Sequence, residues 1–201
     1  MGNGAPAPAG GRAEVEDASR AVANAAMERY AGGDDEAFSE LYDALAPRLL
    51  AFLVRQTRDD SRAEDLLQQT MLQIHCARGR FIQGAEVLPW AFAIARRLLI
   101  DSFRRRKHEV ASGSDPAEGA TSTHQPVDER LHAMRVAADV ERELARLPEA
   151  QRIAFELVKR EGLSMKEAAQ VLGTTVTAVK LRAHRAYVAL REALGDSFDN
   201  S

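Results

Sequence analysis

The residues with the most evident chemistry lie in the last forty or so positions of the sequence, between 164 and 194. From Val176 to Arg191 the chain carries several cations and no acid. Apolar residues recur there every three or four positions, which predicts a helix with one apolar and one basic face. Such a helix can turn its N-terminal residues toward base edges in the major groove and its cations toward phosphates. The pattern therefore indicates DNA binding.

A shorter helix is predicted just before it, so that the two form a helix-turn-helix. Ser164 and Glu167 have the spacing of a capping box, and Gly173 suits the left-handed residue that ends a helix. Thr174 or Thr175 can cap the longer helix. We expect that helix to bury Val176, Val179, Ala183, Ala186 and Leu190. Its candidate DNA contacts are Thr175, Thr177, Lys180, Leu181, Arg182, His184 and Arg185. The alternative is an ordinary helical hairpin with a solvated basic face.

A second basic helix is predicted from Trp90 to Lys107. Its first half is largely apolar, and Asp101 is the only acid among the cations of its second half. Cations in a last turn complement the helix dipole, but four in succession exceed that need, which favours phosphate binding. The candidate phosphate contacts are Arg96, Arg97, Arg104, Arg105, Arg106 and Lys107.

Two aromatic residues precede or begin this basic helix. Phe81 lies in a predicted loop from Phe81 to Leu88, and Trp90 follows Pro89, which suits a first helical turn. Both rings could stack on unpaired bases, as in proteins that bind single strands. A lone Trp at a helix start is more often part of the core, and both interpretations stay open.

The elements that must position these residues are all predicted to be helices, so the fold class is all-α. Pro47 is expected to separate a helix at 35–45 from one at 48–58. Ser61 and Glu64 have capping-box spacing, and Gly79 is expected to end the helix that they open. Further helices are predicted at 129–146 and 149–160.

The helices group into two small domains. Residues 1–25, rich in Gly, Ala and Pro, are expected to be a disordered extension. Residues 26–108 form the first domain, 109–130 a flexible acidic linker, and 131–195 the second domain.

Composition excludes several classes of protein. The net charge of −3 does not by itself suggest nucleic acid, so the local basic runs carry that argument. Cys76 is the only cysteine, which excludes an internal disulfide, and we expect its thiol to be partly buried beside a surface His75. No metal-ligand spacing, signal peptide or membrane-spanning run is evident. A cytoplasmic protein without a cofactor or bound metal is expected.

Four stretches in this order resemble bacterial sigma factors of the extracytoplasmic-function (group IV) class of the sigma-70 family. They are Ala63–His75, Pro89–Lys107, Leu144–Leu157 and the helix-turn-helix, and the resemblance covers about 38–194. It implies a four-helix region 2 that binds and melts the promoter −10 element and a region 4 that reads the −35 element. It also implies a transcription initiation factor rather than an enzyme.

The same resemblance assigns partners and sites. Glu64, Asp65 and Gln68 match the segment that meets the clamp helices of the RNA polymerase β′ subunit. Region 4 would also touch the β flap, and an anti-sigma factor is the expected regulator. The −10 contacts implied are Phe81, Gln83, Trp90, Arg96, Arg97, Arg104, Arg105, Arg106 and Lys107, and the −35 contacts are those of the C-terminal helix given above.

The chain departs from its relatives at two positions of that helix. Thr177 stands where relatives often have a glycine, and Leu181 where they have a small polar residue. Leu181 could contact a thymine methyl group, so the −35 sequence read is open. A conventional helix-turn-helix regulator acting without polymerase is the main alternative. An enzyme is disfavoured because no nucleophile–base arrangement or phosphate loop is present.

Overall fold

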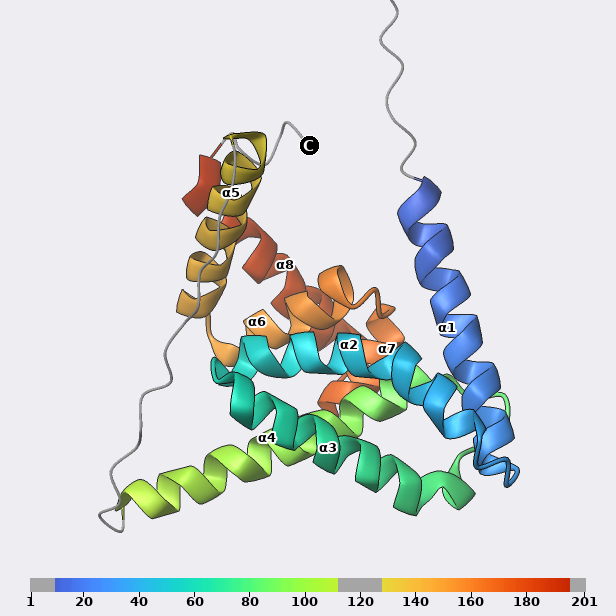
Figure 1. Cartoon of the computed structure of the whole chain (residues 1–201). Helices are drawn as coiled ribbons and strands as arrows, with labels where there is room; N and C mark the ends of the chain where they lie inside the picture. The colour runs from blue at the N-terminus through green and yellow to red at the C-terminus, as the bar shows by residue number, and fades with distance from the viewer. Residues whose placement is uncertain (1–9, 112–127, 196–201) are drawn as a thin grey trace, which may run out of the picture. The chain divides into compact units, whose positions relative to one another are not determined.

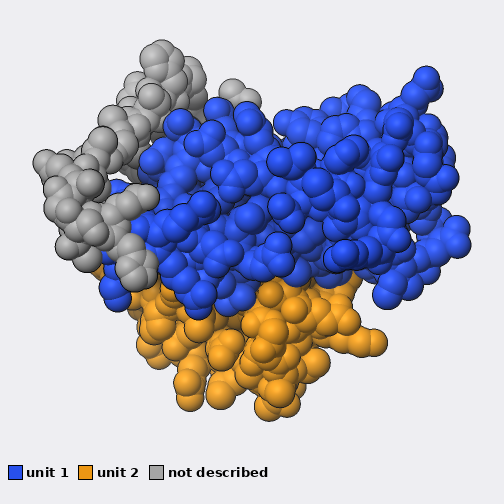
Figure 2. All heavy atoms as spheres, turned by 90° about the horizontal axis from the view of Figure 1, so that it is seen from below, with its two compact units in different colours: residues 1–114 blue, residues 115–201 orange. Residues whose placement is uncertain are grey.

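Helices make up all the regular structure that the computed structural model describes, which covers residues 10–111 and 128–195 (Figure 1). The chain divides into two compact units, residues 1–114 and 115–201 (Figure 2). The prediction of an all-α chain with two small helical domains is therefore confirmed. The centre of the predicted linker, residues 112–127, lies outside the described residues. Its two ends do not match the prediction, because residues 109–111 and 128–130 are helical.

Helix α1 (Gly10–Ala31) occupies most of the segment that the sequence predicts to be disordered. The prediction for residues 1–25 is thus wrong from Gly10 onward, and residues 1–9 lie outside the described part. Ala23, Ala26, Met27 and Tyr30 are buried at helical spacing. Alanine is the strongest helix former, so a composition typical of disorder becomes a helix once one face has a surface to pack against.

Helix α2 (Ala37–Thr57) is continuous through Pro47, which corrects the prediction of two shorter helices. Leu41, Leu45 and Leu49 are completely buried on one face, whereas Pro47 lies on the exposed side. An interior proline costs about 3 kcal/mol. Each buried leucine contributes roughly 1.5–3 kcal/mol, so a face that stays apolar across the proline outweighs that cost.

Helix α3 (Asp60–Ala77) begins two residues before the start that the predicted capping box implies. Asp59 is the N-cap, and its Oδ1 accepts from the Arg62 N–H at 3.1 Å. Arg58 has a φ of 54° and ends α2, so the chain turns at once and Asp59 takes the cap position. The Ser61–Glu64 prediction is therefore wrong. The predicted core positions of this helix are buried: Leu66, Leu67, Thr70, Met71 and Ile74.

The connection to the next helix also differs from the prediction. Gly79 lies inside a short 3₁₀ helix, η1 (Arg78–Arg80), and does not end α3 by a left-handed turn. Helix α4 (Val87–Ala111) starts before Trp90, with Pro89 buried in its first turn. The predicted loop is therefore shorter and spans residues 81–86.

The second unit follows the predicted order. It consists of α5 (Asp128–Arg146), α6 (Glu149–Phe155), a π-helical segment η2 (Glu156–Arg160), α7 (Met165–Leu172) and α8 (Val176–Leu194). One core cluster joins α5, α6 and α8 through Leu144, Phe155, Ala186 and Leu190. The helix predicted at 149–160 is thus only α-helical in its first half.

Candidate nucleic-acid interface

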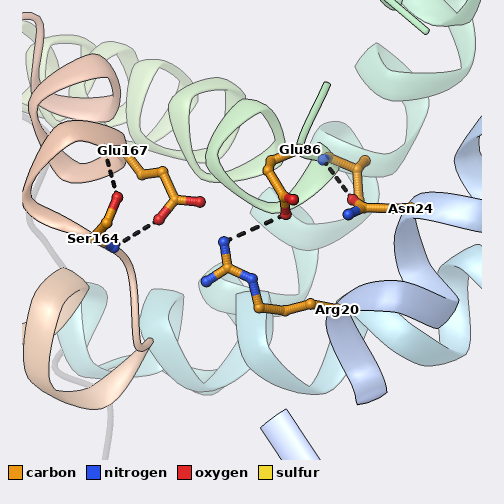
Figure 3. A network of polar contacts seen from close by, with 6 residues as sticks. Arg20, Asn24, Glu86, Ser164 and Glu167 are labelled. Carbon is orange, nitrogen blue, oxygen red and sulfur yellow. Dashed lines mark hydrogen bonds and ion pairs between the residues drawn. The ribbon is translucent and has the colours of Figure 1, made fainter. Parts of the chain in front are cut away.

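Three capping features define the helix-turn-helix of α7 and α8, as the sequence predicts: a capping box, a left-handed glycine and a threonine N-cap. Ser164 Oγ accepts from the Glu167 N–H at 3.2 Å, and Glu167 Oε2 accepts from the Ser164 N–H at 2.6 Å (Figure 3). Gly173 has a φ of 60° and ends α7. Thr175 Oγ1 then accepts from the Ala178 N–H at 3.1 Å, which makes Thr175 the cap of α8. These devices fix where each helix begins and ends.

Helix α8 separates its residues into two faces. Val179, Ala183, Ala186 and Leu190 are buried, as predicted. Val176 is instead 45% exposed. Helical side chains lean toward the N-terminus, so a residue at the first position leans past the end of the packed stripe. Of the candidate DNA contacts, Arg182 is half-buried and the others are exposed: Thr175, Thr177, Lys180, Leu181, His184 and Arg185.

A shallow hollow of about 600 Å³ lies on the exposed face of α8. Four of the candidate contacts line it, namely Thr177, Lys180, Leu181 and His184. Sequence reasoning missed three further lining residues, Lys159, Met165 and Tyr187. Tyr187 follows His184 by three positions and could have been found from the helical period. Lys159 could not, because it belongs to another element.

The π-helical segment η2 brings Lys159 to this hollow. Arg160, the next residue, forms an ion pair with Glu141 of α5, and Glu156 at the start of the segment is buried. Lys159 itself is exposed. A cation from outside α8 therefore joins Lys180 on the same surface, which increases the positive potential that a phosphate backbone would meet.

In the first unit, the candidate phosphate contacts extend along α4. Arg97, Arg104, Arg105 and Lys107 are exposed, whereas Arg96 and Arg106 are half-buried. The Nε atom of Arg96 is buried and has no hydrogen-bond partner among the described residues. Consecutive residues point about 100° apart on a helix, so the cations from Arg104 to Lys107 surround α4 one turn before its end rather than forming one face.

Phe81 and Trp90 pack against each other at the loop that precedes α4. Their ring centroids are 5.3 Å apart and the rings are inclined by 55°. Both residues are half-buried, so each ring is packed on one side and accessible on another. Gln83 is exposed, and Ile82, which sequence reasoning did not single out, is 75% exposed. The loop thus offers partly open aromatic rings next to a polar and an apolar side chain.

Glu64, Asp65 and Gln68 are exposed on α3. Gln68 also lines a hollow of about 520 Å³ together with aromatic and apolar side chains from α1, α2 and α3. Two of these, Leu72 at 58% and Tyr42 at 39%, are exposed hydrophobic residues that the sequence analysis missed. An acidic edge beside exposed apolar residues is typical of a protein–protein interface.

The wall of this hollow is braced by polar contacts. Tyr30 Oη is hydrogen-bonded to His75 Nδ1, and Arg78 pairs with Asp35 while lying 4.8 Å from the centre of the Tyr30 ring. The carboxylate of Asp35, followed by the Tyr30 hydroxyl, raises the pKa of Arg78. These contacts fix the aromatic wall between α1, α2 and α3.

Cys76 is exposed, which corrects the expectation of a partly buried thiol. It lies near the end of α3, on the side away from the buried stripe of Thr70 and Ile74. No cluster of three potential metal ligands occurs within the described ranges. No helix in the same ranges is long and apolar enough to cross a membrane.

Comparison with known protein families gives two matches in the expected order. Residues 41–109 match the model of sigma-70 region 2, and residues 137–190 match that of sigma-70 region 4. The chain is 37% identical over 172 residues to the RNA polymerase sigma factor CarQ of Myxococcus xanthus, covering 85% of this chain and 96% of that protein. It is 36% identical over 188 residues to the ECF sigma factor SigM of Mycobacterium tuberculosis, covering 92% and 88%.

Two solved structures resemble the described fold. One is the sigma factor RpoE in complex with the anti-sigma factor NepR from Bartonella quintana, with a TM-score of 0.65, 26% identity and coverage of 78% of this chain and 96% of that one. The other is CnrH in complex with the cytosolic domain of CnrY, with a TM-score of 0.61, 26% identity and coverage of 88% and 99%.

Proposed function

Because this chain belongs to the extracytoplasmic-function sigma factors of the sigma-70 family, which act in transcription initiation, we propose a division of labour between its two units. The first unit recognises and melts the −10 element of a promoter, and the second reads the −35 element. The chain itself catalyses no reaction, since the core RNA polymerase that it recruits carries out RNA synthesis. Such a factor works in the cytoplasm, where polymerase and chromosome are.

The exposed face of α8 is the observation that carries this proposal. Its cap at Thr175 exposes Thr177, Lys180 and Leu181 in the first turns, where a recognition helix contacts base edges. His184 and Arg185 follow one turn later, and from Val176 to Arg191 the helix has no acid that would repel phosphate. Arg182, which is half-buried, would contact the DNA backbone.

Loop 81–86 and α4 support the role at the −10 element. Melting requires bases to leave the stack, and a protein that captures an extruded base offsets part of that cost. Phe81 and Trp90 offer partly open rings for stacking, and Gln83 offers a polar side chain for a base edge. The exposed cations of α4 would then hold the displaced backbone without reading its sequence.

The acidic edge of α3 supports binding to the β′ clamp helices. Glu64 and Asp65 would pair with cations of the partner, while Gln68 and exposed Leu72 border an apolar hollow that a partner side chain can enter. A contact between region 4 and the β flap would hold the second unit on the same enzyme.

An anti-sigma factor is the regulator that we propose. The structure of RpoE described above contains the anti-sigma factor NepR, and that of CnrH contains the cytosolic domain of a second protein, CnrY. A protein that covers the β′-binding edge or the face of α8 would prevent the chain from reaching polymerase or promoter.

Transcription reconstituted from the full-length chain and core RNA polymerase tests the proposal. We expect weak binding to DNA by the chain alone, and transcripts from cognate promoters only when chain and core enzyme are combined. Tight sequence-specific DNA binding without polymerase, together with no promoter-specific transcription in its presence, would instead favour the conventional helix-turn-helix regulator.

A further inference from the structure

Three side chains of α1 contact the loop between η1 and α4. Glu28 Oε1 accepts from the Gly84 N–H at 2.9 Å, and Asn24 Oδ1 accepts from the Val87 N–H at 2.9 Å. Arg20 donates to the Glu86 carboxylate at 3.4 Å (Figure 3). We call Arg20, Asn24 and Glu28 the α1 stripe. Its members are four residues apart, so they form one row along the helix.

Two of the three contacts satisfy backbone N–H groups that lack a partner within their own element. Val87 is the first residue of α4, and the first N–H groups of a helix have no acceptor inside the helix. Asn24 therefore serves as an N-cap supplied by a different helix. Gly84 has a φ of 77°, a conformation that side-chain-bearing residues rarely adopt, and Glu28 binds the loop at that residue.

The remaining end of the loop is held by an aromatic contact. Phe81 packs on Trp90, with ring centroids 5.3 Å apart. The backbone of residues 81–86 is thus fixed at its start by Phe81, in its middle by Glu28 and at its end by Asn24. Ile82 and Gln83 project into solvent from the first half of this braced segment.

We infer that the α1 stripe is a positioning set that holds loop 81–86 in the shape that captures a non-template base, and thereby determines selectivity at the −10 element. The inference rests on the proposed function and extends it to a helix outside both DNA-binding elements. Asn24 and Glu28 act through backbone N–H groups at the end and in the middle of the loop, and Arg20 acts through the side chain of Glu86.

The experiment uses two measurements on the full-length chain. Trp90 is the only tryptophan of the chain, so quenching of its fluorescence by acrylamide reports on the loop in the absence of polymerase and DNA. Reconstituted transcription from promoters that differ at single −10 positions reports selectivity. Glu28→Ala and Asn24→Ala remove the acceptors. Glu28→Gln and Asn24→Asp keep an acceptor oxygen and serve as conservative rescues.

Arg29→Ala is the matched control. Arg29 also lies on α1, but its ion-pair partner is Glu40 of α2 rather than a loop residue. The variant therefore removes a polar contact of α1 without touching the braced segment.

Both alanine variants should increase the quenching of Trp90 and reduce the preference for the cognate −10 base by about fivefold, the ratio expected for one lost hydrogen bond. The conservative variants and Arg29→Ala should match the unsubstituted chain in both measurements. Unchanged quenching in the alanine variants would show that the stripe does not hold the loop. Increased quenching with unchanged selectivity would show that the conformation of loop 81–86 does not determine base selectivity at the −10 element. If the unsubstituted chain gives no promoter-specific transcription, the proposed function fails, while the quenching result still decides whether the stripe holds the loop.

Discussion

The two surfaces that face DNA in our proposal are built in opposite ways. Helix α8 is regular, and its ends are fixed by the residues next to them, the Thr175 cap and Gly195. Loop 81–86 is irregular, and it is braced by side chains of α1 that are 56 to 66 positions away in the sequence. A DNA-contacting surface on a helix is rigid because the helix's own backbone hydrogen bonds join residues that are close in sequence. A DNA-contacting surface on a loop is only as rigid as the contacts with residues distant in sequence that hold the loop.

The strongest test of this comparison removes the core beneath one reader. Leu190 is completely buried in the cluster that joins α5, α6 and α8. Leu190→Ala should lower the free energy of unfolding of the second unit by about 2–5 kcal/mol, because it leaves a cavity. Circular dichroism during urea titration should then show an earlier helix-loss phase, while Trp90 fluorescence, which reports on the first unit, keeps its midpoint.

Leu49→Ala is the matched control in the first unit, where Leu49 is equally buried on α2. It should shift the Trp90 midpoint and leave the other phase in place. A common shift of both signals in either variant would mean that the two units unfold together, and the contrast between two separate readers would not hold.

A matched pair of glycine substitutions gives a smaller effect that compares the readers directly. Gly173 and Gly84 both have positive φ, and an added Cβ would meet no atom within 4 Å at either position. Alanine therefore introduces backbone strain alone, roughly 1–2 kcal/mol. Gly173→Ala should lower the free energy of unfolding of the second unit by about that amount, because α7 and α8 hold the turn.

Gly84→Ala should change the conformation of loop 81–86 while leaving the thermal stability of the first unit nearly unchanged. The loop can relax by giving up its hydrogen bond to Glu28, so the thermal midpoint should stay close to that of the unsubstituted chain while acrylamide quenching of Trp90 increases. Equal loss of thermal stability in both variants, with unchanged quenching, would show that the loop is as rigid as the helical turn.

The same contrast explains how much of the structure could be predicted from the sequence. The Ser164–Glu167 capping box, the Gly173 turn and the buried face of α8 follow from patterns within one or two turns, and these predictions are confirmed except at Val176, which is exposed. The Asp59 cap was missed because it depends on where the Arg58 turn ends α2. The helix break predicted at Pro47 is wrong because burial of the apolar face of α2 stabilises the continuous helix by more than the interior proline costs.

What depends on contacts distant in sequence could not be predicted. The composition of residues 1–25 predicts disorder, whereas Arg20 and Asn24 lie on helix α1, so the bracing of the loop by these two residues could not be foreseen. Lys159 reaches the hollow on α8 through a π-helical segment, which no periodicity indicated. In both cases a side chain serves a surface built by a different element.

Arg185→Ala should have a moderate effect that is confined to the −35 reader. Arg185 is exposed on α8, and removing one phosphate contact should reduce the slope of log affinity against log salt by about 0.9. The loss should be similar for all −35 sequences, because phosphates carry no sequence information. Holoenzyme binding to promoter fragments over a range of salt concentrations measures both quantities.

Arg142→Ala is the charge-matched control, since Arg142 lies on α5 of the same unit and pairs with Asp139 at 2.9 Å. Its salt slope should stay that of the unsubstituted chain. If both variants reduce the slope equally, the effect comes from net charge and α8 has no special contact at Arg185.

The smallest expected effect is also the sharpest test of how α8 reads sequence. Leu181 is 49% exposed and lines the hollow on the outer face of the helix, whereas Val179 is completely buried on the inner face. Leu181→Ser should change the free energy of unfolding by no more than about 0.5 kcal/mol, since surface substitutions rarely do more. It should nevertheless weaken the preference for thymine at one −35 position, because serine cannot replace the apolar contact with the methyl group.

Val179→Ser, two positions earlier, is the matched control on the buried face. It should unfold the second unit without a defined change of base preference, since it buries a hydroxyl in the core. Selection of bound promoters from a randomised −35 library, together with thermal melts of both variants, separates the two outcomes. If Leu181→Ser destabilises the unit as much as Val179→Ser, then Leu181 supports the fold, and base reading by α8 depends on Thr177 and Lys180 instead.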